Sequence, residues 1–82
     1  MTEQLTLDKI VEIARQVIDD PSVGPQDNFF EAGGDSLDVL ELCTQIENAT
    51  GVEIPMEAVW DAENFESLAA ALAERLPAPL SQ

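Results

Sequence analysis

The sequence predicts an all-α fold: a small four-helix bundle of three longer helices and one short helix, with a long ordered loop between the first two helices. Apolar residues recur at helical spacing in three segments, and proline, glycine and asparagine residues mark the ends of these segments. Hydrophobic residues make up 45% of the 82 residues, which suffices for one small core. We therefore expect a single domain over residues 1–82, folded over about residues 5–76 and frayed over 77–82.

The first helix is predicted over residues 7–18. Its apolar residues fall on one stripe, which comprises Leu7, Ile10, Val11, Ala14, Val17 and Ile18. The helix should stop before Pro21, because a residue that precedes proline avoids helical backbone angles. A long loop over residues 21–35 follows, and its two aromatic residues, Phe29 and Phe30, are expected to anchor it against the helices.

The second helix is predicted over residues 36–50, and Gly51 suits the position just beyond its end. Asp35 and Ser36 are both good N-cap residues, and we expect Ser36 to cap the helix. The core stripe of this helix comprises Val39, Leu42, Cys43 and Ile46. A buried thiol is therefore expected for the single cysteine.

A short helical turn is expected over residues 56–60, with Pro55 at its first helical position and Trp60 as a core residue. The last helix should begin near Phe65, with Asn64 as its N-cap. Its inner stripe comprises Phe65, Leu68, Ala69, Leu72 and Leu76, and the prolines at 77 and 79 should end it.

The charge of the chain is strongly acidic and unevenly distributed. The net charge is −14, and no basic residue lies between Arg15 and Arg75, whereas most of the 17 acidic residues do. Such a surface repels nucleic acids and anionic lipids, so we expect neither a nucleic acid nor a membrane as partner. It attracts proteins with basic patches. The alternative is that the charge only keeps the protein soluble, or adapts it to high salt.

Missing residue types exclude several kinds of chemistry. The chain has one cysteine and no histidine, so it has no internal disulfide, and we expect no metal site. Residues 34–37 read Gly-Asp-Ser-Leu, a string also found in serine esterases, but an esterase serine needs a base such as histidine. We therefore expect no enzymatic activity. The N-terminal residues do not resemble a signal peptide and no apolar run is long enough for a membrane span, so we expect a cytoplasmic protein.

The most informative motif is Gly33-Gly34-Asp35-Ser36-Leu37. It places the Ser36 hydroxyl at the start of a helix, behind a turn of two glycines. The glycines leave little side-chain bulk around this hydroxyl, so another enzyme could approach it closely. Ser36 is therefore a candidate for modification, and the alternative is that it only caps the helix.

The face of the second helix that lies opposite its core stripe mixes leucines with polar and acidic residues. Apolar contacts supply affinity in a protein interface, and carboxylates steer and orient the partner. We therefore predict a docking surface on this face, the alternative being that its leucines are exposed by accident. The candidate docking residues are Leu37, Asp38, Leu40, Glu41, Thr44 and Glu47.

The segment Asp27-Asn28-Phe29-Phe30-Glu31-Ala32-Gly33-Gly34-Asp35-Ser36-Leu37 resembles the modification-site motif of acyl and peptidyl carrier proteins. The resemblance extends from the first predicted helix to the last. It implies that Ser36 receives a 4'-phosphopantetheine arm from coenzyme A, with Gly34, Asp35 and Leu37 flanking the site. It also implies that a phosphopantetheinyl transferase and a magnesium ion carry out this reaction.

The resemblance further implies that the thiol of the arm carries an acyl, aminoacyl or peptidyl group as a thioester. The partners would be a loading enzyme, either an adenylating enzyme or an acyltransferase, and a downstream synthase or transferase with basic docking patches. The double glycine resembles carriers of polyketide and nonribosomal peptide pathways, and Thr50 and Trp60 argue against burial of a long fatty chain. We expect a stand-alone monomeric carrier, and an excised module of a megasynthase is the alternative to the stand-alone state. The alternative is an unmodified acidic protein–protein interaction module.

Overall fold

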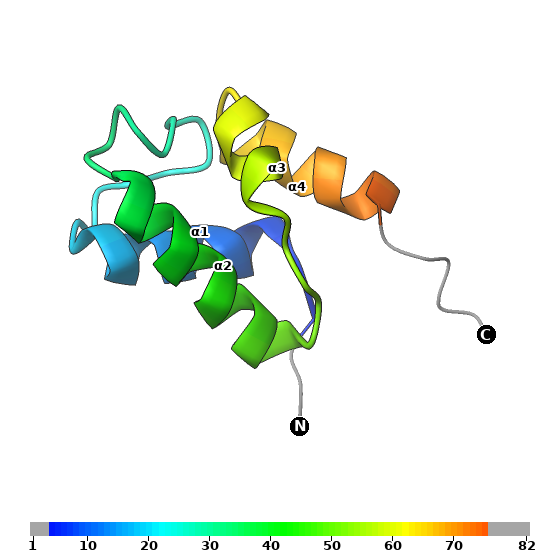
Figure 1. The fold of residues 1–82 in the computed structure, drawn as a ribbon. Coiled ribbons are helices and arrows are strands. Elements are labelled where there is room, and N and C mark those ends of the chain that lie inside the picture. Colours follow the sequence, from blue (N-terminus) through cyan, green and yellow to red (C-terminus); the bar gives the residue numbers. More distant parts are fainter. Residues whose placement is uncertain (1–3, 76–82) are drawn as a thin grey trace.

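The computed structural model describes residues 4–75, which fold into four helices (Figure 1). Their bounds are α1, Leu7–Ile18; α2, Ser36–Thr50; α3, Met56–Asp61; and α4, Phe65–Arg75. The described residues contain no strand. The predicted all-α bundle with one short helix and a long loop is confirmed. The expected frayed tail, the core position of Leu76 and the prolines at 77 and 79 lie outside the described residues.

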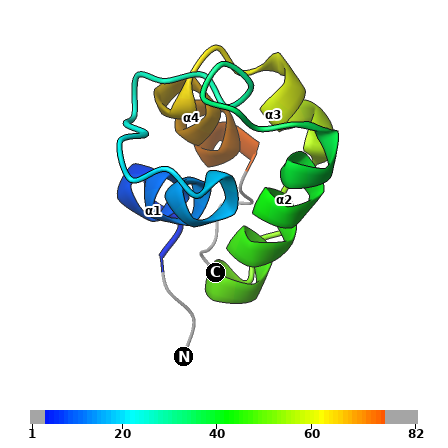
Figure 2. The ribbon, with the colours of Figure 1, turned by 90° about the vertical axis from the view of Figure 1, so that its left-hand side faces the viewer.

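The four helices form a closed set of contacts around one core. Helix α1 contacts α2 and α4, and the short helix α3 contacts α2 and α4. Figure 2 shows the loop between α1 and α2 arching over one end of the helices, close to the connection between α3 and α4. The buried apolar residues come from every helix, from this loop and from the connection between α2 and α3: Ile10, Val11, Ile13, Ala14, Val23, Phe29, Val39, Leu42, Cys43, Ile46, Ile54, Ala58, Val59, Phe65, Leu68 and Leu72.

Helix α1 has the predicted bounds but a broader buried face than the predicted stripe. Ile13 is buried, although the predicted stripe omits it. The reason is that α1 packs against two helices, α2 and α4, so more than one side of it is covered. The helix ends at Asp19, which adopts left-handed backbone angles with φ 64° and donates its N–H to the Arg15 carbonyl. The helix therefore ends before Pro21, as predicted, and the left-handed Asp19 forms its C-terminal cap.

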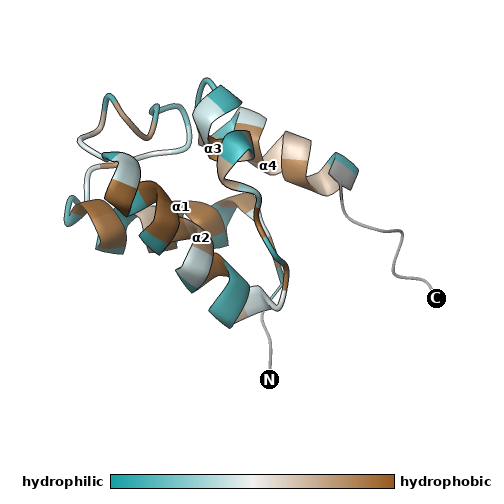
Figure 3. Cartoon of the chain, in the orientation of Figure 1, coloured by the Kyte–Doolittle hydropathy of each residue, from teal (hydrophilic) through white to brown (hydrophobic). Residues whose placement is uncertain are grey.

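Helix α2 also has the predicted bounds and core stripe. Val39, Leu42, Cys43 and Ile46 are all buried. Gly51 ends the helix with φ 76° and donates its N–H to the Glu47 carbonyl. Figure 3 shows that the apolar residues are concentrated in the first turns of α2 and that its C-terminal end is hydrophilic.

The short helix α3 departs from the prediction in two ways. Pro55 is its N-cap, with extended backbone angles, and not its first helical residue. Trp60 is 48% exposed, so its predicted core position is wrong. One face of its indole stacks on the ring of Phe30, with centroids 4.7 Å apart and an interplanar angle of 16°. Trp60 therefore covers the loop from outside, and the core is closed by its neighbours Ala58 and Val59.

The acidic surface gives a first prediction, on stability. Because no cation lies between Arg15 and Arg75 in the sequence, the carboxylates of α2, α3 and the loops repel one another across a small body. Salt shortens the range of this repulsion to about 10 Å at 0.1 M. We expect the melting temperature, followed by circular dichroism at fixed pH, to rise as sodium chloride is raised from about 5 to about 200 mM. A flat or falling melting temperature would show that the charge does not strain the fold.

Candidate functional site

Ser36 is the first residue of α2, and its side chain is exposed. The N-cap is Asp35, so the prediction that Ser36 caps the helix is wrong. The Asp35 carboxylate accepts the backbone N–H of Asp38 at 3.0 Å, and the Asp38 carboxylate accepts the backbone N–H of Asp35 at 3.2 Å. This reciprocal capping box satisfies the helix start without Ser36. Within residues 4–75, the Ser36 hydroxyl has no hydrogen-bond partner.

The two glycines before Asp35 have separate structural reasons. Gly33 has φ 116°, a backbone angle that residues with a side chain rarely adopt. Gly34 lies under the ring of Phe29: a Cβ at Gly34 would overlap the Phe29 Cε2 atom and lie 2.7 Å from Cδ2 and 2.8 Å from Cζ. The sequence alone predicts that these glycines form a sharp turn and clear space around Ser36. The structure adds that Gly34 makes room for a buried aromatic ring.

All four aromatic residues of the chain form one continuous cluster beside this turn. Phe29 packs edge-on against Phe30 and Phe65, with centroids 5.5 and 6.2 Å apart, and Phe30 stacks on Trp60. Phe29 is buried and Phe30 is half-buried, which confirms that the aromatic residues anchor the loop. The cluster fixes the segment before Ser36 to α3 and α4.

The backbone from Asn28 to Gly34 forms a compact turn that leads directly into the helix start. Ala32 N–H donates to the Asn28 carbonyl at 2.9 Å, and Gly34 N–H donates to the Phe29 carbonyl at 3.0 Å. The side chain of Asn28 holds the start of this turn. Sequence reasoning assigns Asn28 no role, although asparagine followed by a loop is the ordinary signal of such a side-chain turn.

The outer face of α2 carries the predicted docking residues in exposed positions. Leu37 is 76% exposed and Leu40 is 52% exposed. Three polar candidates, Glu41, Thr44 and Glu47, are also exposed. Asp38 differs from these because it is half-buried and engaged in the capping box.

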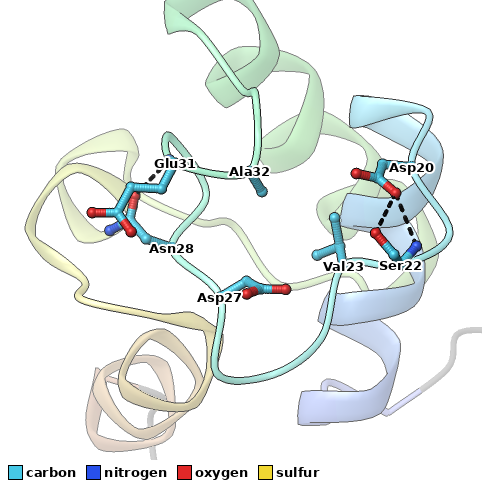
Figure 4. Close-up of a pocket in the computed structure, with 7 residues that line it drawn as sticks. All are labelled: Asp20, Ser22, Val23, Asp27, Asn28, Glu31 and Ala32. Carbon is cyan, nitrogen blue, oxygen red and sulfur yellow. Dashed lines mark hydrogen bonds between the residues drawn. The ribbon is translucent and has the colours of Figure 1, made fainter.

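A polar hollow of about 370 Å³ is formed within the loop between α1 and α2, and Ser36 is not among its lining residues (Figure 4). Its lining residues are Asp20, Ser22, Val23, Asp27, Asn28, Glu31 and Ala32. The Asp20 carboxylate accepts the Ser22 hydroxyl at 2.6 Å and the Ser22 N–H at 2.9 Å, and these bonds lower the pKa of Asp20. Asp27 accepts the N–H of Gly24 at 2.8 Å. The two carboxylates therefore stabilise the loop itself.

Cys43 lies on the core side of α2 and is 7% exposed, so its thiol is not available at the surface as a nucleophile. Burial raises the pKa of its thiol, so the protonated form is favoured. Over residues 4–75, no group of three or more potential metal-ligating side chains is brought together. None of the described helices is long and apolar enough to cross a membrane.

Residues 8–72 match the protein family described as "Phosphopantetheine attachment site". The chain belongs to this family. Among its relatives, tyrocidine synthase 3 of Brevibacillus parabrevis is 38% identical over 66 residues, which are 80% of this chain. Gramicidin S synthase 2 of Brevibacillus brevis is 32% identical over 66 residues, again 80% of this chain. The chain spans only 1% and 2% of the lengths of these two relatives.

Two solved structures resemble the whole carrier domain. One is a peptidyl carrier protein in complex with the phosphopantetheine transferase Sfp and coenzyme A; its TM-score is 0.76, with 28% identity over 92% of this chain and 96% of that one. The other is a solution structure of a peptidyl carrier domain prototype, with a TM-score of 0.69 and 27% identity over 89% of this chain and 96% of that one. The predicted carrier fold, its phosphopantetheine cofactor and its non-catalytic character are thereby confirmed.

Proposed function

We propose that Ser36 is the residue of this carrier domain that holds the 4'-phosphopantetheine arm. The observation that carries the proposal is the exposed Ser36 hydroxyl at the first residue of α2, which no other group of the described chain engages. In the reaction, this oxygen would attack the phosphorus of coenzyme A that bears the pantetheine group. A phosphodiester forms, 3',5'-ADP leaves, and the serine proton passes to a base of the transferase.

The surroundings of Ser36 fit such a group. Gly34 adds no side chain beside the hydroxyl, and Leu37 points its side chain into solvent. Asp35 satisfies the helix start by itself, so esterification of Ser36 removes no cap. A phosphate at the N-terminus of a 15-residue helix is also favoured by the helix dipole. When bound, the arm supplies a thiol that holds the cargo as a thioester.

Intact-protein mass spectrometry tests this function. The unmodified protein is incubated with coenzyme A, magnesium and the transferase Sfp, which forms a complex with a carrier protein of the same fold. We expect the mass to increase by one phosphopantetheine group and no more. No mass increase, with a known peptidyl carrier modified in the same tube, would support the alternative of an unmodified acidic interaction module.

We further propose that partner enzymes with basic patches dock on the outer face of α2. The supporting observations are the exposed leucines at 37 and 40 and the exposed carboxylates of Glu41 and Glu47. The two leucines bury apolar area on contact, and the carboxylates steer the partner toward Ser36. The partners meant are the phosphopantetheinyl transferase, a loading enzyme and a downstream synthase or transferase.

Charge reversal on α2 tests the docking proposal. We expect Glu41→Lys and Glu47→Lys each to raise the KM for the carrier in the transferase or loading reaction, with stability changed by no more than about 0.5 kcal/mol. The effect should shrink as salt rises. Glu74→Lys, an exposed position on α4, makes the same change of charge and should leave KM unchanged. Unchanged KM in both α2 variants at low salt would remove α2 from the docking surface.

The cargo we propose is an aminoacyl or peptidyl group. This choice is supported by the similarity of the domain to segments of tyrocidine synthase 3 and gramicidin S synthase 2. The double-glycine motif alone does not distinguish a peptide pathway from a polyketide pathway. A polyketide acyl group is the second candidate, because the double-glycine motif is shared by both kinds of pathway. The stand-alone and monomeric states stay predictions. The elution volume of the native protein on a calibrated sizing column gives its size, which should be that of one chain of 82 residues if both predictions hold.

A further inference from the structure

We propose that Asn28 is a positioning residue for the modification of Ser36, which it serves by fixing the turn before α2 to the connection between α3 and α4. This inference rests on the proposed role of Ser36. Asn28 lies eight positions earlier in the chain and does not touch the hydroxyl. Its amide instead joins two segments that are more than thirty residues apart in sequence, at the rim of the polar hollow (Figure 4).

The oxygen of the Asn28 amide holds the turn. Oδ1 accepts the backbone N–H of Phe30 at 2.8 Å and that of Glu31 at 3.1 Å. Figure 4 shows the bond to Glu31 and the turn that it closes. These two bonds shape the beginning of the segment whose later N–H groups, on Gly33 and Gly34, donate to the carbonyls of Phe30 and Phe29. The backbone conformation of this turn therefore determines where Asp35 and Ser36 lie at the start of α2.

The nitrogen of the same amide ties this turn to the rest of the domain. Nδ2 donates to the carbonyl of Glu63 at 2.9 Å and to that of Ala62 at 3.3 Å. Ala62 and Glu63 lie in the connection between α3 and α4, and Trp60 of α3 also contacts the turn by stacking on Phe30. Asn28 therefore sets where the turn sits relative to α3 and α4, while its oxygen sets the shape of the turn.

Only a side chain with both an acceptor and two donors can make all four bonds. Aspartate keeps the oxygen for Phe30 and Glu31 but offers no donor to the two carbonyls. Alanine keeps neither half. The fold has further ties at this place, because Phe65 N–H donates to the Asp27 carbonyl and Glu66 N–H to the Pro25 carbonyl. Variants at Asn28 are therefore expected to fold while the turn shifts.

The kinetics of pantetheinylation separate a positioning role from a structural one. If a variant is only partly folded, the concentration of usable carrier falls, so the apparent KM rises and kcat at saturation is unchanged. If the domain docks normally but presents Ser36 out of place, kcat falls and KM stays near the wild-type value. Docking variants on α2 should raise KM and leave kcat unchanged, whereas variants at Asn28 should lower kcat and leave KM unchanged.

The experiment measures kcat and KM for Asn28→Ala and Asn28→Asp with Sfp and coenzyme A, with the folded fraction of each variant determined by circular dichroism. We expect kcat of Asn28→Ala to fall about tenfold with KM within twofold of wild type, because the variant docks normally but presents Ser36 out of place. Asn28→Asp, which retains the acceptor half, should lie between Asn28→Ala and wild type. Gln26→Ala is the matched control, an exposed amide in the same loop, and should behave as wild type.

The inference is overturned if kcat of Asn28→Ala stays within twofold of wild type, or if only KM changes in proportion to the folded fraction. Failure of the wild-type protein itself to accept the arm contradicts the proposed function instead. The wild-type reaction therefore distinguishes failure of the proposed function from failure of the role of Asn28.

Discussion

Ser36→Ala should abolish pantetheinylation completely and leave the fold almost unchanged. The substitution removes the proposed acceptor oxygen, and no neighbouring hydroxyl can replace it, since residues 32–41 contain no other. The cost of about 1 kcal/mol that accompanies loss of an N-cap is not expected, because Asp35 is the cap. Alanine at the first residue of a helix should change stability by no more than about 0.5 kcal/mol.

Two measurements check this result side by side. Intact mass after incubation with coenzyme A, magnesium and Sfp gives the extent of modification, and urea unfolding followed by circular dichroism gives the stability. Ser22→Ala is the matched control, because it removes an exposed serine hydroxyl from the same loop. The control should be modified at the wild-type rate. A folded Ser36→Ala variant that still gains the arm would show that another residue is the acceptor.

Gly34→Ala should destabilise the domain by overpacking the loop against a buried aromatic ring. The added Cβ would overlap the ring of Phe29, which is buried against Phe65 and Phe30 and cannot simply turn away. Overpacking of this kind costs about 1–3 kcal/mol. The φ angle of Gly34 is not in the left-handed region, so the loss is expected from packing alone.

The free energy of unfolding in urea, compared among three variants, checks this explanation. Gly24→Ala is the matched control, because the nearest atom to its added Cβ is the Asp27 carboxylate oxygen at 3.9 Å, and it should be nearly neutral. Phe29→Leu should partly relieve Gly34→Ala when the two are combined, since the smaller side chain leaves room. Strictly additive losses in the double variant would contradict contact between residues 29 and 34 as the cause.

The bounds of α1 and α2 could be predicted because their signals are local. Apolar spacing, a polar residue before the helix and a glycine after it all lie within a few positions of each boundary. The choice between Asp35 and Ser36 as N-cap needed the side-chain geometry, although an acidic residue three positions after Asp35 is the signal of a capping box. The chemistry of the site could be predicted from the motif, whereas the N-cap of α2 could be identified only from the structure.

Contacts between distant segments account for the expectations that failed. The size of Trp60 predicts a core position, but its partner Phe30 lies 30 positions away in the loop and stacks on it from inside. A single predicted stripe omits Ile13, because it does not anticipate two neighbouring helices. The four bonds of Asn28 depend on carbonyls more than thirty positions later, which no local pattern specifies.

Localisation of the arm within the chain tests the central claim most directly. Cleavage after glutamate releases residues 32–41, in which Ser36 is the single hydroxyl and no thiol occurs. After reaction with coenzyme A and the transferase, we expect this peptide to carry the entire phosphopantetheine mass and every other peptide to remain unmodified. An unmodified peptide 32–41, with the added mass on any other fragment, would contradict the assignment of Ser36.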